Sequence, residues 1–150
     1  MYLYTLENTE NRIPILVKEK DVSNRETSVT SPESIANLFN HAFNLRYKAE
    51  EHVYLLCADT KMHIVGIFEI SHGTVNMSCL SPREIFIRAC LCGAVNIILV
   101  HNHPSGDPTP SKEDFEVYNR LNKASEIMGI SLIDSIIIGD YYYSFNESGI

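Results

Sequence analysis

Two histidines, a serine and an aspartate lie close together in the segment HNHPSGDPTPSKED, which runs from His101 to Asp114. The apolar, β-branched run before it, residues 95–100, predicts a strand buried on both faces of a sheet. Alternation at the end of that strand would point His101 and His103 to the same side, within reach of one metal ion. Asp114 falls in the first turn of the helix predicted after Ser111, where the helix dipole favours an ionised carboxylate. Two imidazoles and a carboxylate, with a fourth position left for water, are the donor set expected of a catalytic zinc site.

A hydrolytic zinc site also requires a general base beside the water that it activates. The candidate is Glu69, which lies near the end of the alternating run KMHIVGIFEI. In this run Val65, Ile67 and Glu69 are predicted to share one face, so an acid stands where the pattern predicts an apolar side chain. A carboxylate in that position needs a partner or a chemical role.

Simpler interpretations of the same residues remain open. Ser111 and Asp114 could be only a helix cap, although capping a helix and facing a metal are compatible. A His-x-His pair is often a surface feature, and a lone glutamate such as Glu69 is more often an acid at a strand edge. It is the joint spacing that favours a metal site. Four further histidines have no matching spacing and are assigned to no site: His41, His52, His63 and His72.

The spacing His-x-His, seven residues, Ser, two residues and Asp, with a glutamate upstream, resembles the JAMM motif of the JAB/MPN metalloprotease family. The resemblance is closest to the RadC-type branch of that family and covers residues 31–150. It is carried by several separate segments in the family's order: GIFEISHGT, SPREIF, IILVHNHPSGDPTPSKED, LIDSIIIG and YYSFNESG.

The resemblance implies a role for each residue of the segment. Glu69 would be the general acid/base acting on the attacking water, and Ser111 would help to stabilise the tetrahedral oxyanion. A zinc ion (Zn²⁺) would be bound by His101, His103 and Asp114. The implied fold is a three-layer αβα domain around a central mixed β-sheet, similar to MPN and cytidine deaminase domains.

This sequence departs from the RadC-type pattern in two places. Chains of this type usually carry a helix-hairpin-helix segment before the domain, and no segment of that length precedes residue 31 here, which weakens an inference of DNA binding. They also commonly have a histidine where this chain has Ser135. The neighbouring Asp134 is interpreted either as a residue that orients a ligand or as a structural acid at a strand end.

The hydrophobic pattern predicts one α/β domain in which strands and helices alternate. Ser31-Pro32 and Ser81-Pro82 are helix starts, with Glu84 placed for a capping box. The first twenty residues predict two short strands or an extended arm, and residues 21–30 a loop or linker, so the domains are residues 1–30 and 31–150. The helices are expected over 32–45, 82–93 and 112–128, and the strands over 52–59, 61–70, 95–100, 130–139 and 141–147.

Composition restricts the environment and the partners of the chain. With 45% hydrophobic and 21% charged residues it is expected to be soluble and globular, and no apolar run approaches the length of a membrane span. The predicted compartment is the cytoplasm, since no signal peptide is recognisable. The net charge of −7 disfavours DNA binding by this chain alone. The four cysteines are expected to be reduced, mostly buried thiols: Cys57, Cys79, Cys90 and Cys92.

The leading functional hypothesis is therefore a zinc-dependent hydrolase that cleaves a peptide or isopeptide-like amide bond in a protein or peptide substrate. Two alternatives stay open, a DNA-repair-associated factor of RadC type and a protein-interaction module. A zinc nucleobase deaminase is excluded because its Pro-Cys-x-x-Cys segment has no counterpart; Cys90 and Cys92 have the wrong spacing and lie upstream. The oligomeric state is left open, a dimer included.

Overall fold

The computed structural model describes residues 1–22, 31–73 and 80–150, and this part of the chain contains seven strands, three α-helices and one short 3-10 turn. The helices are α1 (Pro32–Phe43), α2 (Pro82–Leu91) and α3 (Lys112–Met128), and the 3-10 turn is η1 (Leu45–Tyr47). The strands are β1 (Tyr2–Asn8), β2 (Pro14–Asp21), β3 (His52–Ala58), β4 (Ile64–His72), β5 (Asn96–Asn102), β6 (Ser131–Ile138) and β7 (Tyr142–Ser144).

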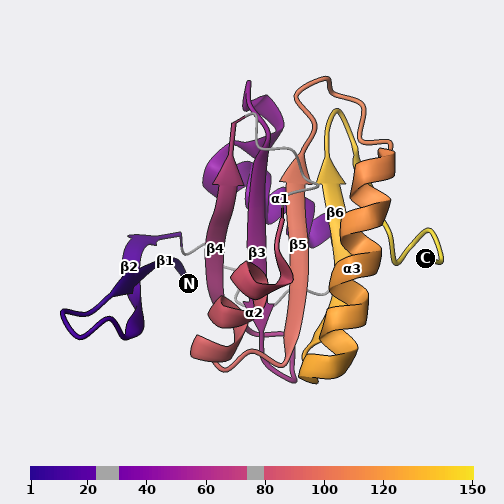
Figure 1. Ribbon diagram of the computed structural model, residues 1–150. Helices are drawn as coiled ribbons and strands as arrows, with labels where there is room; N and C mark the ends of the chain where they lie inside the picture. The colour runs from indigo at the N-terminus through magenta and orange to yellow at the C-terminus, as the bar shows by residue number, and fades with distance from the viewer. Residues whose placement is uncertain (23–30, 74–79) are drawn as a thin grey trace.

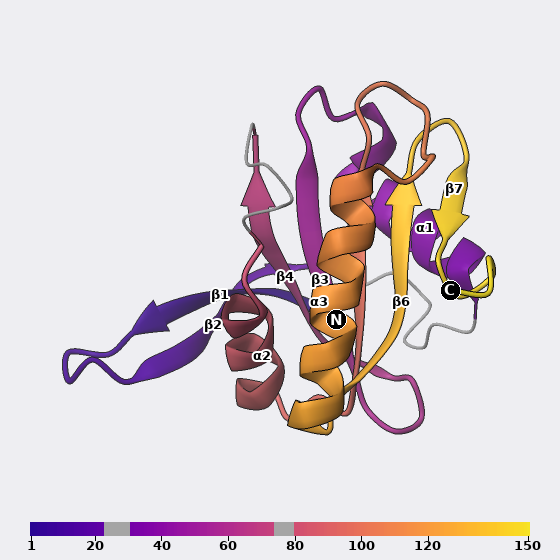
Figure 2. The same ribbon diagram turned by 45° about the vertical axis from the view of Figure 1, so that its right-hand side comes forward.

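The strands form one mixed sheet in the order β2-β1-β4-β3-β5-β6-β7 (Figure 1). The pairs β1–β4 and β5–β6 are parallel, and the other neighbours are antiparallel. Helix α1 covers one face of the sheet, and α2 and α3 cover the other (Figures 1 and 2). The predicted α/β fold with a central mixed sheet in three layers is therefore confirmed.

The helix boundaries follow from their caps. Ser31 caps α1 in a reciprocal box with Ser34, and the helix ends two residues earlier than predicted because Asn44 adopts a left-handed conformation with φ 54°. At α2 the hydroxyl of Ser81 accepts a hydrogen bond from the Arg83 amide, as expected for an N-cap. The predicted capping role of Glu84 is not observed; its carboxylate instead pairs with Arg88 at 3.1 Å.

Two apolar clusters hold the three layers together, one on each face of the sheet. The side facing α1 contains Tyr54 and Ile98, and the side facing α2 and α3 contains Val53 and Leu99. Residues of β3 and β5 thus alternate between the two clusters, as a strand buried on both faces must. This alternation fixes on which side of the sheet each functional side chain lies.

Strand β4 departs from strict alternation twice. Its pairing with β3 passes over Val65 and Ile70, and both of these side chains pack against the α2/α3 cluster. Ile67 instead belongs to the α1 cluster. The prediction that Val65 shares a face with Ile67 and Glu69 is therefore wrong for Val65, because a β-bulge shifts the alternation by one residue.

The first twenty residues form the hairpin β1–β2, which extends the sheet beyond β4 and projects from the body of the protein (Figures 1 and 2). Leu3 of β1 pairs with Ile67 of β4 and is buried. Asp21 belongs to β2, and the rest of the predicted linker after Val22 lies outside the described residues. The proposed domain boundary near residue 30 stays a prediction.

The described cysteines are free thiols. Cys57 is buried and Cys92 is half-buried, but Cys90 is exposed, which corrects the expectation of burial for that residue. Cys79 lies outside the described residues. None of the helices described is both long and apolar enough to cross a membrane.

Candidate metal centre

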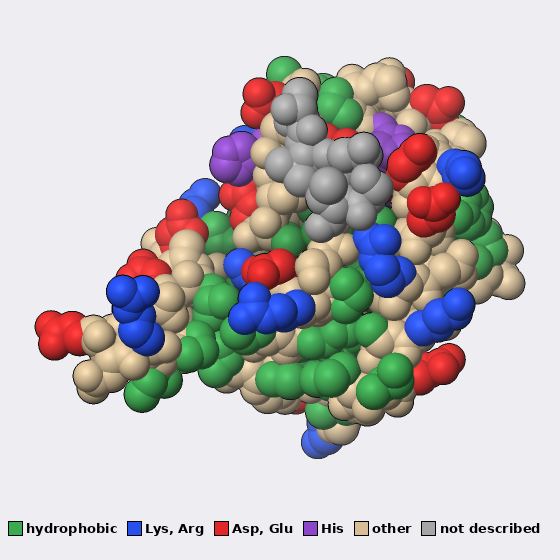
Figure 3. Space-filling view, viewed as in Figure 1, with side chains coloured by type: hydrophobic (Ala, Val, Ile, Leu, Met, Phe, Trp, Pro, Cys, Tyr) green, Lys and Arg blue, Asp and Glu red, His purple; other side chains and the backbone are tan. Residues whose placement is uncertain are grey.

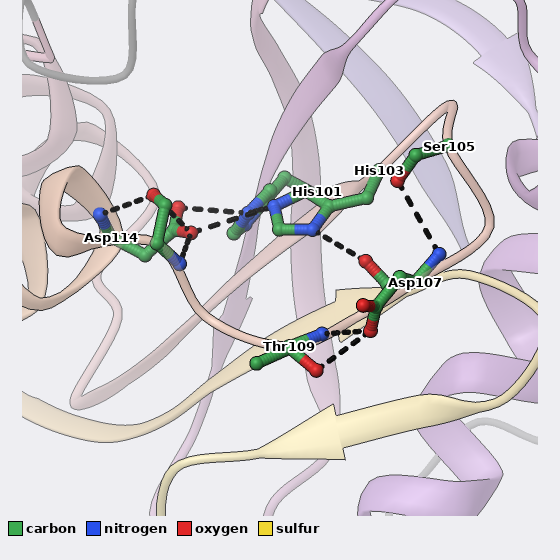
Figure 4. Close-up of polar contacts among 7 residues, drawn as sticks. His101, His103, Ser105, Asp107, Thr109 and Asp114 are labelled. Atoms are coloured by element: carbon green, nitrogen blue, oxygen red, sulfur yellow. Dashed lines mark hydrogen bonds and ion pairs between the residues drawn. The ribbon is translucent and has the colours of Figure 1, made fainter.

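Three side chains converge where β5 ends and α3 begins (Figure 4). Nε2 of His101 lies 3.1 Å from Oδ1 of Asp114, and Nε2 of His103 lies 3.4 Å from Oδ2 of the same carboxylate. The two Nε2 atoms are 3.2 Å apart. The structure thus brings together the three residues predicted as metal ligands, although they are separated by up to thirteen positions in the chain.

This geometry fits a zinc ion. Two nitrogen ligands at about 2.0–2.1 Å from a tetrahedral ion are separated by roughly 3.3 Å, close to the distance between the two Nε2 atoms. His101 is completely buried, and its Nδ1 has no hydrogen-bond partner among the described residues. An imidazole buried in this way is costly unless its other nitrogen is well bound. The donor set of His101, His103 and Asp114 can therefore hold zinc.

The loop after β5 fixes the orientation of His103. Its Nδ1 lies 2.9 Å from the carbonyl oxygen of Asp107 (Figure 4). Because a carbonyl only accepts, Nδ1 carries a proton, and Nε2 is the nitrogen that faces the site. Asp107 is itself held by Thr109, whose amide and hydroxyl donate to its carboxylate. A side chain at Gly139 would collide with the backbone of this loop, so the close approach requires glycine there.

Ser111 performs the cap predicted for it and also contacts the candidate ligand. The Ser111 hydroxyl donates to Oδ2 of Asp114 at 2.7 Å, its amide donates to the same oxygen at 2.7 Å, and the amide of Asp114 donates to the hydroxyl. Burial raises the pKa of Asp114, but hydrogen bonds from His101 and His103 outweigh it and hold the pKa well below its usual range. The carboxylate is thus ionised and oriented before any ligand binds.

Glu69 does not lie beside this cluster. Val53 of β3 pairs with His101, whereas the next residue, Tyr54, pairs with Glu69. Paired residues point to the same face and consecutive residues to opposite faces, so Glu69 lies on the α1 side and His101 on the α3 side. The placement predicted for Glu69 is therefore wrong. Its nearest polar partners are His52 at 2.7 Å and His72 at 3.5 Å.

The acid that shares the side of the metal ligands is Glu51, which the sequence reasoning missed. It lies two residues before Val53 and so returns to the face of His101. Burial raises the pKa of Glu51, while the charges of His101 and His103 oppose that rise. A half-buried carboxyl with a raised pKa beside two imidazoles is suited to proton transfer. The sequence contains one sign of this role. Glu50 and Glu51 stand together directly before β3, the strand that pairs antiparallel with β5.

Asp134 has a structural role. Its carboxylate accepts hydrogen bonds from the Ser144 hydroxyl at 2.6 Å and from the amides of Ser135 and Asn146 at 2.7 and 3.0 Å. It pairs with Ile98 on the α1 side, away from His101. Between the two interpretations left open, the structure favours a structural acid that fastens the C-terminal turn, but Asp134 lies within β6 and not at its end. Ser135 pairs with Leu99 and so lies on the side of His101.

The surface around the site differs in character from the rest of this side of the protein. Apolar side chains gather over the lower part, where α2 and α3 pack, and histidine and acidic side chains lie nearer the end of β5 (Figure 3). Ile127, Met128 and Leu91 are the exposed apolar residues of α2 and α3 in the described chain. The surface near the end of β5 is therefore more polar than the surface over α2 and α3.

Comparison with known proteins identifies the family of this chain. Residues 29–150 match the family model described as the RadC-like JAB domain, and the chain belongs to that family. The predicted resemblance is thereby confirmed, including the narrower RadC-type assignment.

Similar full-length proteins are known from several bacteria. The chain is 50% identical over 113 residues to a UPF0758 protein of Caldanaerobacter subterraneus, an alignment that covers 75% of this chain and 48% of that protein. It is 46% identical over 122 residues to a UPF0758 protein of Trichlorobacter lovleyi, covering 81% and 52%, and 41% identical over 118 residues to one from Thermotoga maritima, covering 78% and 53%. The chain thus spans about half the length of the curated relatives that it matches.

Proposed function

We propose that this chain is a zinc-dependent hydrolase of JAMM type that cleaves a peptide or isopeptide-like amide bond. The observation that carries the proposal is the convergence of three ligand atoms, Nε2 of His101, Nε2 of His103 and a carboxylate oxygen of Asp114, on one point. Membership of the RadC-like JAB family supports it.

Each side chain of the site has a distinct task in this reaction. His101, His103 and Asp114 would hold a zinc ion, which would supply the Lewis acidity needed at the scissile carbonyl and the attacking water. Glu51 takes the proton of the attacking water and delivers it to the leaving amine, a role for which its raised pKa is suited. The Ser111 hydroxyl, which donates its one proton to Oδ2 of Asp114 in this structure, would turn to donate it to the developing oxyanion, while the Ser111 amide keeps its hydrogen bond to Asp114.

The substrate class follows from the same chemistry. An amide carbonyl requires both polarisation and protonation of its leaving nitrogen, which are the two functions that the site contains. We propose a protein or peptide as the partner, bound at the polar surface beside the end of β5.

The experiment that tests the proposal measures zinc and hydrolysis together. The purified chain is expected to bind zinc through this site and to cleave members of a library of internally quenched peptides or lysine-linked isopeptides. His103→Ala should remove that zinc and abolish cleavage, because it removes one of three ligands. His63→Ala is the matched control, since the His63 side chain is exposed and its ion pair within the described part of the chain is with Asp59. Zinc content unaffected by His103→Ala would refute the site.

A further inference from the structure

A second group of metal-ligating side chains lies on the opposite face of the sheet. His52 begins β3, and Glu69 and His72 lie near the end of β4. Nδ1 of His52 is 2.7 Å and Nδ1 of His72 is 3.5 Å from the same oxygen, Oε1 of Glu69. One ligand atom from each residue lies within 4.8 Å of the other two. We call this group the His52 cluster.

A β-bulge assembles the His52 cluster. His52 pairs with His72 and Tyr54 pairs with Glu69, so the pairing passes over Ile70, whose side chain packs on the other face. Glu69 and His72 are three positions apart, and in a regular strand they would point to opposite faces. The bulge at Ile70 turns both to the side of His52. Bulges of this kind commonly re-aim a side chain at a site.

The exposure of the three side chains to solvent increases from His52 through Glu69 to His72. The exposed fraction is 13% for the side chain of His52, 33% for Glu69 and 65% for His72. The imidazole rings of His52 and His72 are nearly parallel, with centroids 5.5 Å apart and an interplanar angle of 23°. The inner ligand is therefore held in place, and the outer one can adjust and leaves room for water.

We propose that the His52 cluster binds a second divalent ion of the zinc class, with one Nδ1 from each histidine and a carboxylate oxygen of Glu69 as ligands. Imidazole nitrogen and carboxylate oxygen suit zinc and its transition-metal neighbours and would leave at least one position for water. Ligand atoms around such an ion are separated by roughly 3.3 Å, so the contact of 2.7 Å between His52 and Glu69 must lengthen and the exposed His72 side chain must rotate for the ion to bind. The inference does not rest on the proposed hydrolase.

The His52 cluster is connected by the backbone to the first site. The amide of His52 donates to the side-chain oxygen of Asn102, which lies between His101 and His103 in the chain. The amide of Gly73 donates to the carbonyl of Glu51 at 2.9 Å. An ion that joins His52 to His72 therefore clamps the two strand ends next to Glu51.

The test counts zinc ions per chain by equilibrium dialysis in a buffered zinc solution, followed by elemental mass spectrometry. We expect two zinc ions per chain in the original protein. We expect one in His72→Ala, because the substitution removes a ligand of the second ion. His72 is exposed, so its removal should leave the fold and the first site intact. His63→Ala is the control, since it removes an imidazole 3.1 Å from a single carboxylate and should leave two ions. Thermal unfolding of the zinc-free proteins checks that each variant is folded.

The two sites give separable outcomes. His103→Ala should also bind one zinc ion, and the double variant His72→Ala with His103→Ala none. If His72→Ala binds as much zinc as the original protein, the second site is refuted, whatever the result for His103. If the original protein binds one ion that His72→Ala removes and His103→Ala does not, the second site stands and the proposed hydrolase fails.

Discussion

At the scale of single residues, the sheet separates two glutamates that lie near neighbouring strand ends. Glu51 faces His101 and His103, and its pKa is raised by burial. Glu69 faces His52 and Tyr54, and it raises the pKa of the tyrosine beyond what burial does alone. A carboxylate can act on a reacting water only within hydrogen-bond reach, so their chemistry differs although their type is the same.

Glu51→Gln is therefore expected to lower kcat for amide hydrolysis by about 100-fold or more, because the amide keeps the shape of the side chain but cannot carry the proton. Zinc content should not change. Steady-state kinetics and elemental analysis of the same preparation measure both. Glu50→Gln, which makes the same change at the exposed neighbouring acid, is the matched control. Loss of hydrolysis in Glu69→Gln with full activity in Glu51→Gln would contradict this assignment.

At the scale of elements, one buried carboxylate within β6 holds the end of β7 and the turn that follows it. Asp134 is 2% exposed and is the common acceptor for a hydroxyl and two amides. Buried donors that lose their acceptor cost about 1–3 kcal/mol each. The closing strand is short, only Tyr142–Ser144, so the hydrogen bonds to Asp134 contribute a large part of what holds this edge.

Asp134→Ala is expected to lower the free energy of unfolding by roughly 2–5 kcal/mol, because it leaves at least two buried donors without an acceptor. Urea denaturation measures this. Asp140→Ala is the control: Asp140 makes an exposed ion pair with Arg46, and its loss should cost no more than about 1 kcal/mol. Equal losses of unfolding free energy in the two variants would show that the hydrogen bonds to Asp134 do not account for the loss of stability. Reduced zinc binding by folded Asp134→Ala would restore the ligand-orienting interpretation.

At the scale of the whole molecule, the net charge bears on the prediction that the partner is a protein and not DNA. The chain has 12 basic and 19 acidic residues, a net charge of −7. Binding to DNA without sequence preference depends on the release of counterions by clustered lysines and arginines, and it weakens steeply with salt. A negatively charged chain is repelled from the phosphate backbone at long range.

We expect this chain to bind duplex DNA no tighter than about 100 μM at physiological salt, the weak end of non-specific binding. Fluorescence anisotropy of a labelled duplex, titrated at several salt concentrations, measures it. Low-micromolar affinity that falls with added salt would instead support the DNA-associated function. The expectation concerns this chain, which spans about half the length of its relatives.

The sequence by itself determined the helices, the central strands and the three candidate metal ligands. These features are local: serine caps with proline, an apolar run that must be buried, and histidines whose spacing matches one strand end. A single loop joins His101 and His103 to Asp114. Their proximity could therefore be predicted without knowing how distant strands pair.

Only the tertiary structure decided which glutamate accompanies them. A shift of one residue in strand pairing moves a side chain to the other face of the sheet, and β4 contains two such shifts, at Val65 and Ile70. The His52 cluster could not be predicted for the same reason. Glu69 and His72 are three positions apart and would point to opposite faces of a regular strand. Neighbouring strands far apart in sequence place Glu51 at the site, and that order is set by the packing of the whole sheet.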